Sequence, residues 1–206
     1  MEDILEVYHR PYDPDYPVVC MDESSKQLVA DVVTPIPASP GKPKRIEYEY
    51  IRKGVAQIFL ATEPLTGALT VHVKRRRTSQ DWAEFIKHLL DNCYPDAKKM
   101  VLVMDNLNTH GIASLYATFA PAEALRLASR LEIHYTPKNG SWLNVAEIEF
   151  SALSVQCLDR RFEDKNALIT EIAAWEAYRN ARRRPVNWQF KTADARIKLK
   201  GLYPQI

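Results

Sequence analysis

The sequence predicts an α/β fold in which a mixed sheet of five strands is flanked by helices. Its segments follow the order of three strands, a helix, a strand, a helix, a strand and a helix. A turn-rich segment joins the second and third strand-like runs, which indicates an antiparallel hairpin, whereas helices separate the later strands. The length of 206 residues and the hydrophobic content of 46% suit one domain with a full-sized core.

Strand signals dominate the first third of the chain. After a proline-rich lead-in, a valine-rich apolar run predicts a strand at about Pro17–Asp22. The breaker-rich segment TPIPASPGKPKR separates it from strands near Glu49–Ala61 and Ala68–Arg75. The segment EPLTG between these two strands has turn chemistry, so they are expected to form the hairpin.

Helices and strands alternate in the rest of the chain. Ser79 can cap a helix, and a strand follows at Met100–Met104. A helical stretch near Ser114–Arg130, which Pro121 must interrupt or restart, leads to a strand at Leu131–Tyr135. Two further helices are predicted, one beginning at Ser141 and one whose apolar stripe is expected to be core. That stripe consists of Leu168, Ile172, Trp175 and Tyr178.

Three acidic residues are the most informative feature of the sequence. Asp22 and Asp105 follow the apolar runs Val18–Met21 and Val101–Met104, so both are expected at the carboxyl ends of strands. Glu147 lies on the later helix, and only the fold can bring it near the two aspartates. Hard divalent cations such as Mg²⁺ bind a few such carboxylates and keep positions free for water and phosphate.

The motifs around these acids resemble the Asp-Asp-Glu (DDE) transposases of bacterial insertion sequences, in the branch related to the mariner elements. Asp22 precedes Glu-Ser, Asp105 opens the segment DNLNTH, and Glu147 follows Trp-Leu-Asn by three residues in NGSWLNVAEIEFS. The resemblance runs from about Val18 to the C-terminus. Forty-one residues separate Asp105 from Glu147, more than the mid-thirties spacing usual in mariner relatives, and the stretch Pro121–Arg130 accounts for the extra length.

The resemblance implies a ribonuclease-H-like, retroviral-integrase-like fold and two-metal phosphodiester chemistry. Two Mg²⁺ or Mn²⁺ ions would relieve the repulsion between the carboxylates and promote an in-line displacement. Asp22 would contact both ions, and Asp105 and Glu147 would each hold one. The implied reactions are cleavage of DNA strands at the ends of a mobile element and transfer of the freed 3′ ends to target DNA.

Several neighbouring residues have two interpretations. Glu147 and Glu149 fall on opposite flanks of their helix's apolar stripe, so only the resemblance selects Glu147. Glu23 points to the strand face opposite Asp22 and is therefore not expected to be a ligand. His110 either begins a helix or orients a metal ligand, and Asn106 and Asn144 either cap locally or support the carboxylates.

Basic residues form two clusters although the formal net charge is only +2. From Asp159 onward there are eleven Lys or Arg residues against six Asp or Glu residues. The bland interpretation is solvated surface, but beside a phosphodiester site contact with DNA phosphates is favoured. The predicted DNA-binding residues are Lys74, Arg75, Arg76, Arg77, Lys138, Arg179, Arg182, Arg183 and Arg184.

The predicted organisation is a lead-in at 1–17, the catalytic domain at 18–185 and a basic C-terminal extension at 186–206. Relatives carry an N-terminal helix-turn-helix region that is not expected here, so the chain is interpreted as a catalytic domain alone. Double-stranded DNA is the expected partner, a homodimer is left open, and a cytoplasmic, nucleoid-associated location without membrane contact is expected. The alternatives are a catalytically silent DNA-binding descendant and a structure-specific nuclease of the same fold.

Overall fold

A computed structural model describes residues 1–107, 110–138 and 140–203 and places five strands in one sheet of order β3-β2-β1-β4-β5. The pairs β1–β2 and β2–β3 are antiparallel, and the pairs β1–β4 and β4–β5 are parallel. The predicted mixed sheet is therefore confirmed. The strands are β1 (Val18–Asp31), β2 (Tyr50–Glu63), β3 (Ala68–Lys74), β4 (Met100–Met104) and β5 (Leu131–Tyr135). Two residues of the DNLNTH motif, residue 139 and the last three residues of the chain lie outside the described residues.

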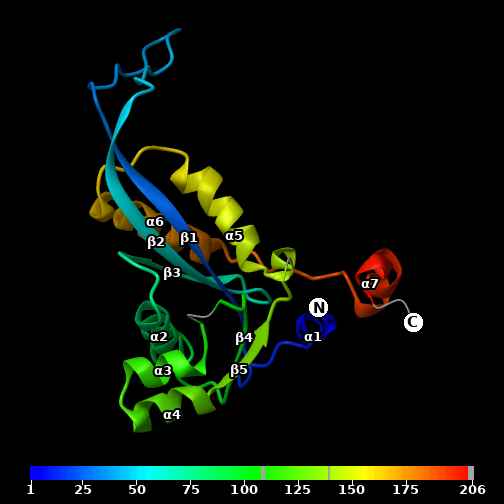
Figure 1. Ribbon diagram of the computed structural model, residues 1–206. Helices are drawn as coiled ribbons and strands as arrows, with labels where there is room; N and C mark the ends of the chain where they lie inside the picture. Colours follow the sequence, from blue (N-terminus) through cyan, green and yellow to red (C-terminus); the bar gives the residue numbers. More distant parts are fainter. Residues whose placement is uncertain (108–109, 139, 204–206) are drawn as a thin grey trace.

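Helices cover both faces of the sheet (Figure 1). Alternate β1 side chains enter two separate cores: Val19 and Met21 pack with α2–α4, whereas Val18 and Cys20 pack with α1, α5 and α6. None of the described helices is long and apolar enough to cross a membrane. The helices are α1 (Glu2–Tyr8), α2 (Ser79–His88), α3 (Ile112–Thr118), α4 (Pro121–Ser129), α5 (Ala146–Leu153), α6 (Lys165–Arg182) and α7 (Thr192–Lys198), with short turns η1 (Leu89–Cys93), η2 (Ser141–Leu143), η3 (Ser154–Leu158) and η4 (Lys200–Leu202).

Strands β1 and β2 form a hairpin that extends well beyond the rest of the sheet (Figure 1). Both strands have 14 residues, but only Val18–Cys20 of β1 pair with β4. Asp22 therefore lies inside β1 and not at its carboxyl end, which corrects the predicted strand end at this residue. The prediction failed because the polar sequence DESSKQ gives no apolar signal, while β2 supplies the hydrogen-bonding partner that continues the strand.

The two ends of the chain pack together on the α5 side of the sheet. Residues 1–17, predicted as a lead-in, contain α1, in which Ile4 and Leu5 are fully buried. Arg196 of α7 forms an ion pair with Glu2 of α1 at 2.8 Å. The predicted C-terminal extension therefore contacts the N-terminal helix.

Three local features differ from the sequence predictions. Thr78, not Ser79, caps α2, because its side chain and that of Asp81 form a reciprocal capping box. The helix that carries Glu147 begins at Ala146, since the residues after Ser141 first form a short 3₁₀ turn. Tyr178 is 53% exposed and is not part of the core. Pro121 restarts the helix as predicted and stands at the first turn of α4.

Candidate functional site

The sheet brings Asp22 and Asp105 to the same edge. The last parallel pair between β1 and β4 joins Cys20 to Val103, and each aspartate lies two residues beyond its member of this pair. Strand β4 ends at Met104, so Asp105 emerges at its carboxyl end as predicted. Ligand sites of open α/β sheets commonly form at this edge.

Hydrogen bonds hold the Asp22 carboxylate on two sides. The backbone N–H of Glu23 donates to Oδ1 at 2.7 Å, and the side-chain amide of Asn144 donates to Oδ2 at 3.3 Å. The same amide donates to the carbonyl of Met21 at 2.9 Å, which fixes its orientation. Asn144 is buried, and its amide links the Asp22 carboxylate to the backbone of β1.

Electrostatics link Asp22 to the other two predicted acids. The pKa of Asp22 is raised to about 6. Burial is the largest cause, and the negative charges of Asp105 and Glu147 also contribute. The hydrogen bond from the Glu23 N–H opposes this shift. The negative charges at the end of β4 and on α5 therefore act on the Asp22 carboxylate in β1, and the use of Asp22, Asp105 and Glu147 as one ligand set stays a prediction.

The two glutamates of α5 point to different environments. Glu149 is only 4% exposed, and both its oxygens accept hydrogen bonds from Nη2 of Arg179, at 2.6 and 2.5 Å. Glu147 is half-buried and is the one whose charge acts on Asp22. Glu149 therefore holds α5 to α6, and Glu147 is the helix acid on the side of the aspartates.

His110 connects Asp105 to a further acid. Its Nδ1 lies 2.8 Å from Asp105 and its Nε2 lies 2.8 Å from Glu23. Burial alone would lower the pKa of His110, but the hydrogen bonds to the two carboxylates outweigh burial and raise it to about 9. At neutral pH the imidazolium therefore donates through both nitrogens, and it stacks on the indole of Trp82.

Glu23 contacts the site, although strand alternation excludes it as a ligand beside Asp22. Its side chain points away from Asp22, as strand alternation predicts, and reaches His110 from the opposite face of β1. The Glu23 side chain is 3% exposed, and its Oε2 has no hydrogen-bond partner among the described residues. Strand alternation correctly predicts that Glu23 faces away from Asp22. It cannot predict the contact with His110, which lies 87 positions later in the sequence.

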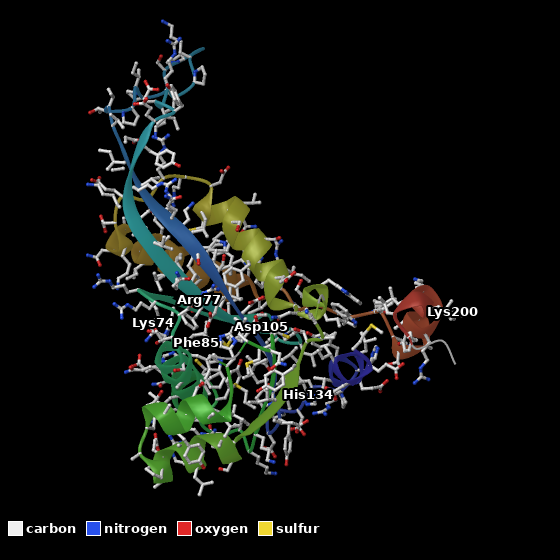
Figure 2. All side chains as sticks on the ribbon, in the orientation of Figure 1. Lys74, Arg77, Phe85, Asp105, His134 and Lys200 are labelled. Carbon is white, nitrogen blue, oxygen red and sulfur yellow. The ribbon has the colours of Figure 1, made fainter. Side chains whose placement is uncertain are left out.

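An open cavity of about 570 Å³ lies beside Asp105. Asn106 is exposed and lines this cavity with Asp105, and no hydrogen bond fixes its side chain among the described contacts. Lys138, in the segment after β5, is exposed and also lines this cavity. Figure 2 places Asp105 at the centre of the molecule, where the two helical layers meet the sheet.

The donor chemistry of this site suits a hard divalent cation, because the predicted ligands offer carboxylate oxygens only. The side chains do not yet stand in a ligating arrangement: within the described ranges, no group of three or more His, Cys, Asp or Glu side chains is placed to hold a metal ion. His110 and Asn144 each engage one oxygen of a predicted ligand. Each of these oxygens would have to exchange its hydrogen bond for a metal contact if it became a ligand.

The predicted DNA-contacting residues divide into exposed and engaged side chains. Arg75, Arg76 and Arg77 are exposed after β3, whereas Lys74 forms an ion pair with Glu84 at 2.7 Å. Arg179 is placed differently from the sequence prediction. It is 12% exposed and satisfies the buried Glu149.

The end of α6 carries the remaining predicted arginines. Arg182 stacks on the ring of Tyr178 at 3.7 Å and lines a cavity with Arg184. Arg183 ends the helix with φ of +29° and its charge acts on Glu63, so it faces a different side of the molecule. The cluster therefore does not form one continuous surface.

The mixed sheet with helices on both faces is a ribonuclease-H-like fold. The family described as DDE superfamily endonuclease matches residues 17–169, and the chain belongs to this family. No curated protein matches the sequence.

Solved structures with the same fold are complexes of the Mos1 mariner transposase. A Mos1 paired-end complex with Mn superposes with a TM-score of 0.57 at 16% identity and covers 86% of this chain and 52% of Mos1. A Mos1 complex with the left transposon end gives a TM-score of 0.59 at 13% identity, with 85% and 53% covered. The chain therefore spans about half the length of these proteins, and identities this low show the shared fold alone.

Proposed function

We propose that the chain is the catalytic domain of a DDE transposase, which cuts DNA strands and transfers them during transposition of an insertion sequence. The observation that carries the proposal is the cluster of Asp22, Asp105 and Glu147, in which two acids raise the pKa of the third. Family membership and the likeness to Mos1 complexes with transposon DNA support it. Action on chromosomal DNA would associate the chain with the nucleoid.

The three acids would hold divalent ions, Mg²⁺ or Mn²⁺, and structures of Mos1 complexes with Mn or Mg support this choice of ions. Two bound ions would supply activation of a water or 3′-hydroxyl and stabilisation of the leaving oxygen. His110 would position Asp105, and Asn144 would position Asp22. Lys138 beside the Asp105 cavity would hold a phosphate of the DNA strand.

A strand-nicking assay tests the proposal. We expect nicking of duplex DNA with Mg²⁺ or Mn²⁺, none with EDTA, loss of activity in Asp105→Asn, and retention in Asp96→Asn, which changes an exposed aspartate away from the cluster. Joining of an added 3′ end to a target duplex would distinguish a transposase from a structure-specific nuclease. Activity that survives in Asp22→Asn, Asp105→Asn and Glu147→Gln would refute the assignment of these acids.

The competing candidate is a catalytically silent, transposase-derived DNA-binding protein. One observation favours it: no three acidic side chains in the described part of the chain stand in a ligating arrangement. The three acids are nevertheless all present, and supporting residues hold two of them. DNA binding without metal-dependent nicking would select this candidate.

A further inference from the structure

A basic cavity lies beside the β1–β2 hairpin, away from the carboxylate cluster. Its volume is about 760 Å³, and it lies between the hairpin, the end of β3 and the start of α6. We propose that this cavity holds backbone phosphates of bound duplex DNA, an inference that rests on the proposed function. Four cations line it, namely Lys53, Arg75, Arg76 and Lys165.

A β-bulge brings Lys53 to the cavity. Leu28 of β1 pairs with Gly54, but the next residue, Val29, pairs with Arg52, so Lys53 is the extra residue in β2. Gly54 adopts φ of +117°, a conformation that other residues rarely take. Bulges commonly redirect a side chain. The bulge residues Lys53 and Gly54 both line the cavity.

Contacts among the described residues do not explain the charges of Arg75 and Arg76. They lie in the short connection between Lys74, the last residue of β3, and Thr78, the cap of α2. Both are exposed, and neither forms an ion pair with a described residue, in contrast to Lys74, which pairs with Glu84. Adjacent unpaired arginines repel each other, and an anionic ligand would relieve that repulsion.

Lys165 stands where a cation is unfavourable for the helix. It is the first residue of α6, and the positive end of the helix dipole disfavours a cation at that position. No ion pair with a described residue offsets this effect. The carboxylate of Asp164 accepts the N–H groups of Asn166 and Ala167, so it serves the helix itself. Helix stability therefore does not explain Lys165.

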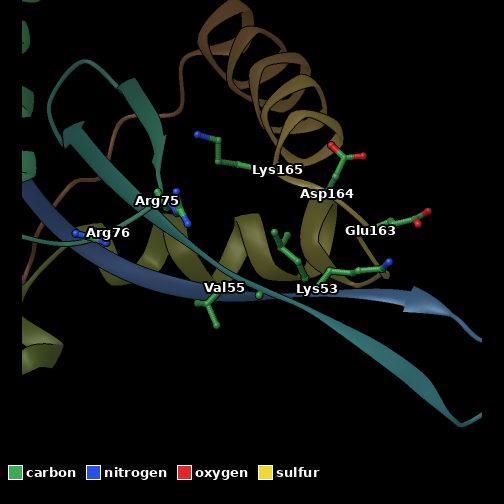
Figure 3. A pocket seen from close by; sticks show the side chains of 9 residues that line it. Lys53, Val55, Arg75, Arg76, Glu163, Asp164 and Lys165 are labelled. Atoms are coloured by element: carbon green, nitrogen blue, oxygen red, sulfur yellow. The ribbon is translucent and has the colours of Figure 1, made fainter.

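Figure 3 shows how the charges divide within the cavity. Arg75, Arg76 and Lys165 lie toward one end, whereas Lys53 points toward the other end, where Glu163 lies. The end with three cations is the part that suits phosphates. Arginine and lysine contacts to phosphate carry no base information, so they position DNA and do not read its sequence.

The distance to the carboxylates defines what the cavity can do. Lys74, beside Arg75, pairs with Gln57 and through it with Ser25. The end with three cations therefore lies roughly 10 Å along β1 from Asp22, at about 3.3 Å per residue, and roughly 10 Å across the sheet, at about 4.8 Å per strand. The resulting separation of roughly 14 Å corresponds to about four phosphates along one DNA strand. The cavity is thus too far from the cleaved bond to take part in chemistry, and it would contribute affinity and alignment.

A salt titration of DNA affinity tests the inference. We would measure binding of a 30-base-pair duplex in Ca²⁺, without strand cleavage, for wild type and Arg75→Ala/Lys165→Ala. The slope of log affinity against log salt should fall by about 1.8, because each lost phosphate contact removes about 0.9. Lys99→Ala is the matched control, since this exposed lysine precedes β4 at the opposite end of that strand from Asp105 and should leave the slope unchanged.

Two further variants guard against misfolding as the cause. Arg75→Lys/Lys165→Arg keeps both charges and should retain the wild-type slope, and Glu163→Gln removes an acid from the cavity and should increase affinity. If wild type binds with a steep slope that Arg75→Ala/Lys165→Ala does not change, the cavity assignment is wrong and the proposed function stands. If wild type binds no duplex at low salt, the proposed function and this inference both fail.

Discussion

Replacement of Arg179 should destabilise the fold far more than it weakens DNA binding. The Arg179 and Glu149 side chains are only 12% and 5% exposed, and their ion pair joins α6 to α5. Arg179→Met would leave Glu149 as a buried charge without its partner, which typically costs about 3–5 kcal/mol. For a chain of 206 residues this corresponds to a fall in Tm of roughly 6–20 °C at about 2–4 °C per kcal/mol.

The double variant Glu149→Leu/Arg179→Met separates the pair from the residues. An apolar replacement of a buried ion pair is often neutral or stabilising, so the double variant should recover most of the loss. Urea unfolding of wild type, both single variants and the double variant gives the coupling free energy. A single Arg179→Met variant within about 1 kcal/mol of wild type, together with a salt slope reduced by about 0.9, would refute this reasoning and make Arg179 a phosphate contact.

Three further predictions concern the turn after β2 and the acidic site. Gly67→Ala should destabilise the fold by more than about 1 kcal/mol. Gly67 has φ of +69°, where other residues are strained, and an added Cβ would lie 2.5 Å from the backbone nitrogen of Arg184 after α6. Mn²⁺ should raise the Tm at pH 8, and the rise should shrink as pH falls through about 6, where Asp22 takes up a proton. Glu23→Gln should lower the pKa of His110 below about 9, measured by NMR of the imidazole.

Matched comparisons test the Gly67→Ala and Mn²⁺ predictions. Gly41 has a similar φ of +73° but open space around its Cβ, so Gly41→Ala isolates the backbone strain, and an equal loss in both variants would exclude a clash at Gly67. An equal Mn²⁺ effect in Asp22→Asn would mean that the ion binds elsewhere. In the apo chain, the raised pKa of Asp22 means that this group favours the fold increasingly as pH falls from about 7 to about 4, and Asp22→Asn should remove that trend.

The elements predicted best are those whose signal is local and apolar. The strands Met100–Met104 and Leu131–Tyr135 have the predicted bounds, since each is a short run bounded by loops or helix ends. Strand β1 extends nine residues past Asp22 because β2 pairs with it, a contact between residues far apart in sequence. Burial of Ile4 likewise depends on helices near the other end of the chain. Such tertiary contacts cannot be deduced from a local pattern.

The candidate site could be predicted as a set of residues but not as a set of contacts. Register alone brings Asp22 beside Asp105, and that follows from two apolar runs in parallel strands. In the structure, Glu149 differs from Glu147 because it binds Arg179, which lies 30 residues further along the chain. Helical periodicity gives the two glutamates equal weight, so a motif was needed to separate them.

The basic residues show why charge counts do not define a nucleic-acid surface. Lys74 and Arg179 belong to predicted DNA-binding clusters, yet ion pairs with Glu84 and Glu149 already neutralise them. Lys165 belongs to neither cluster, yet it lies at a helix start that disfavours its charge and lines a cavity with two arginines. The better candidate for phosphate contact is a cation that forms no ion pair within the fold and does not stabilise its own helix. Its charge becomes favourable only when an anion is bound.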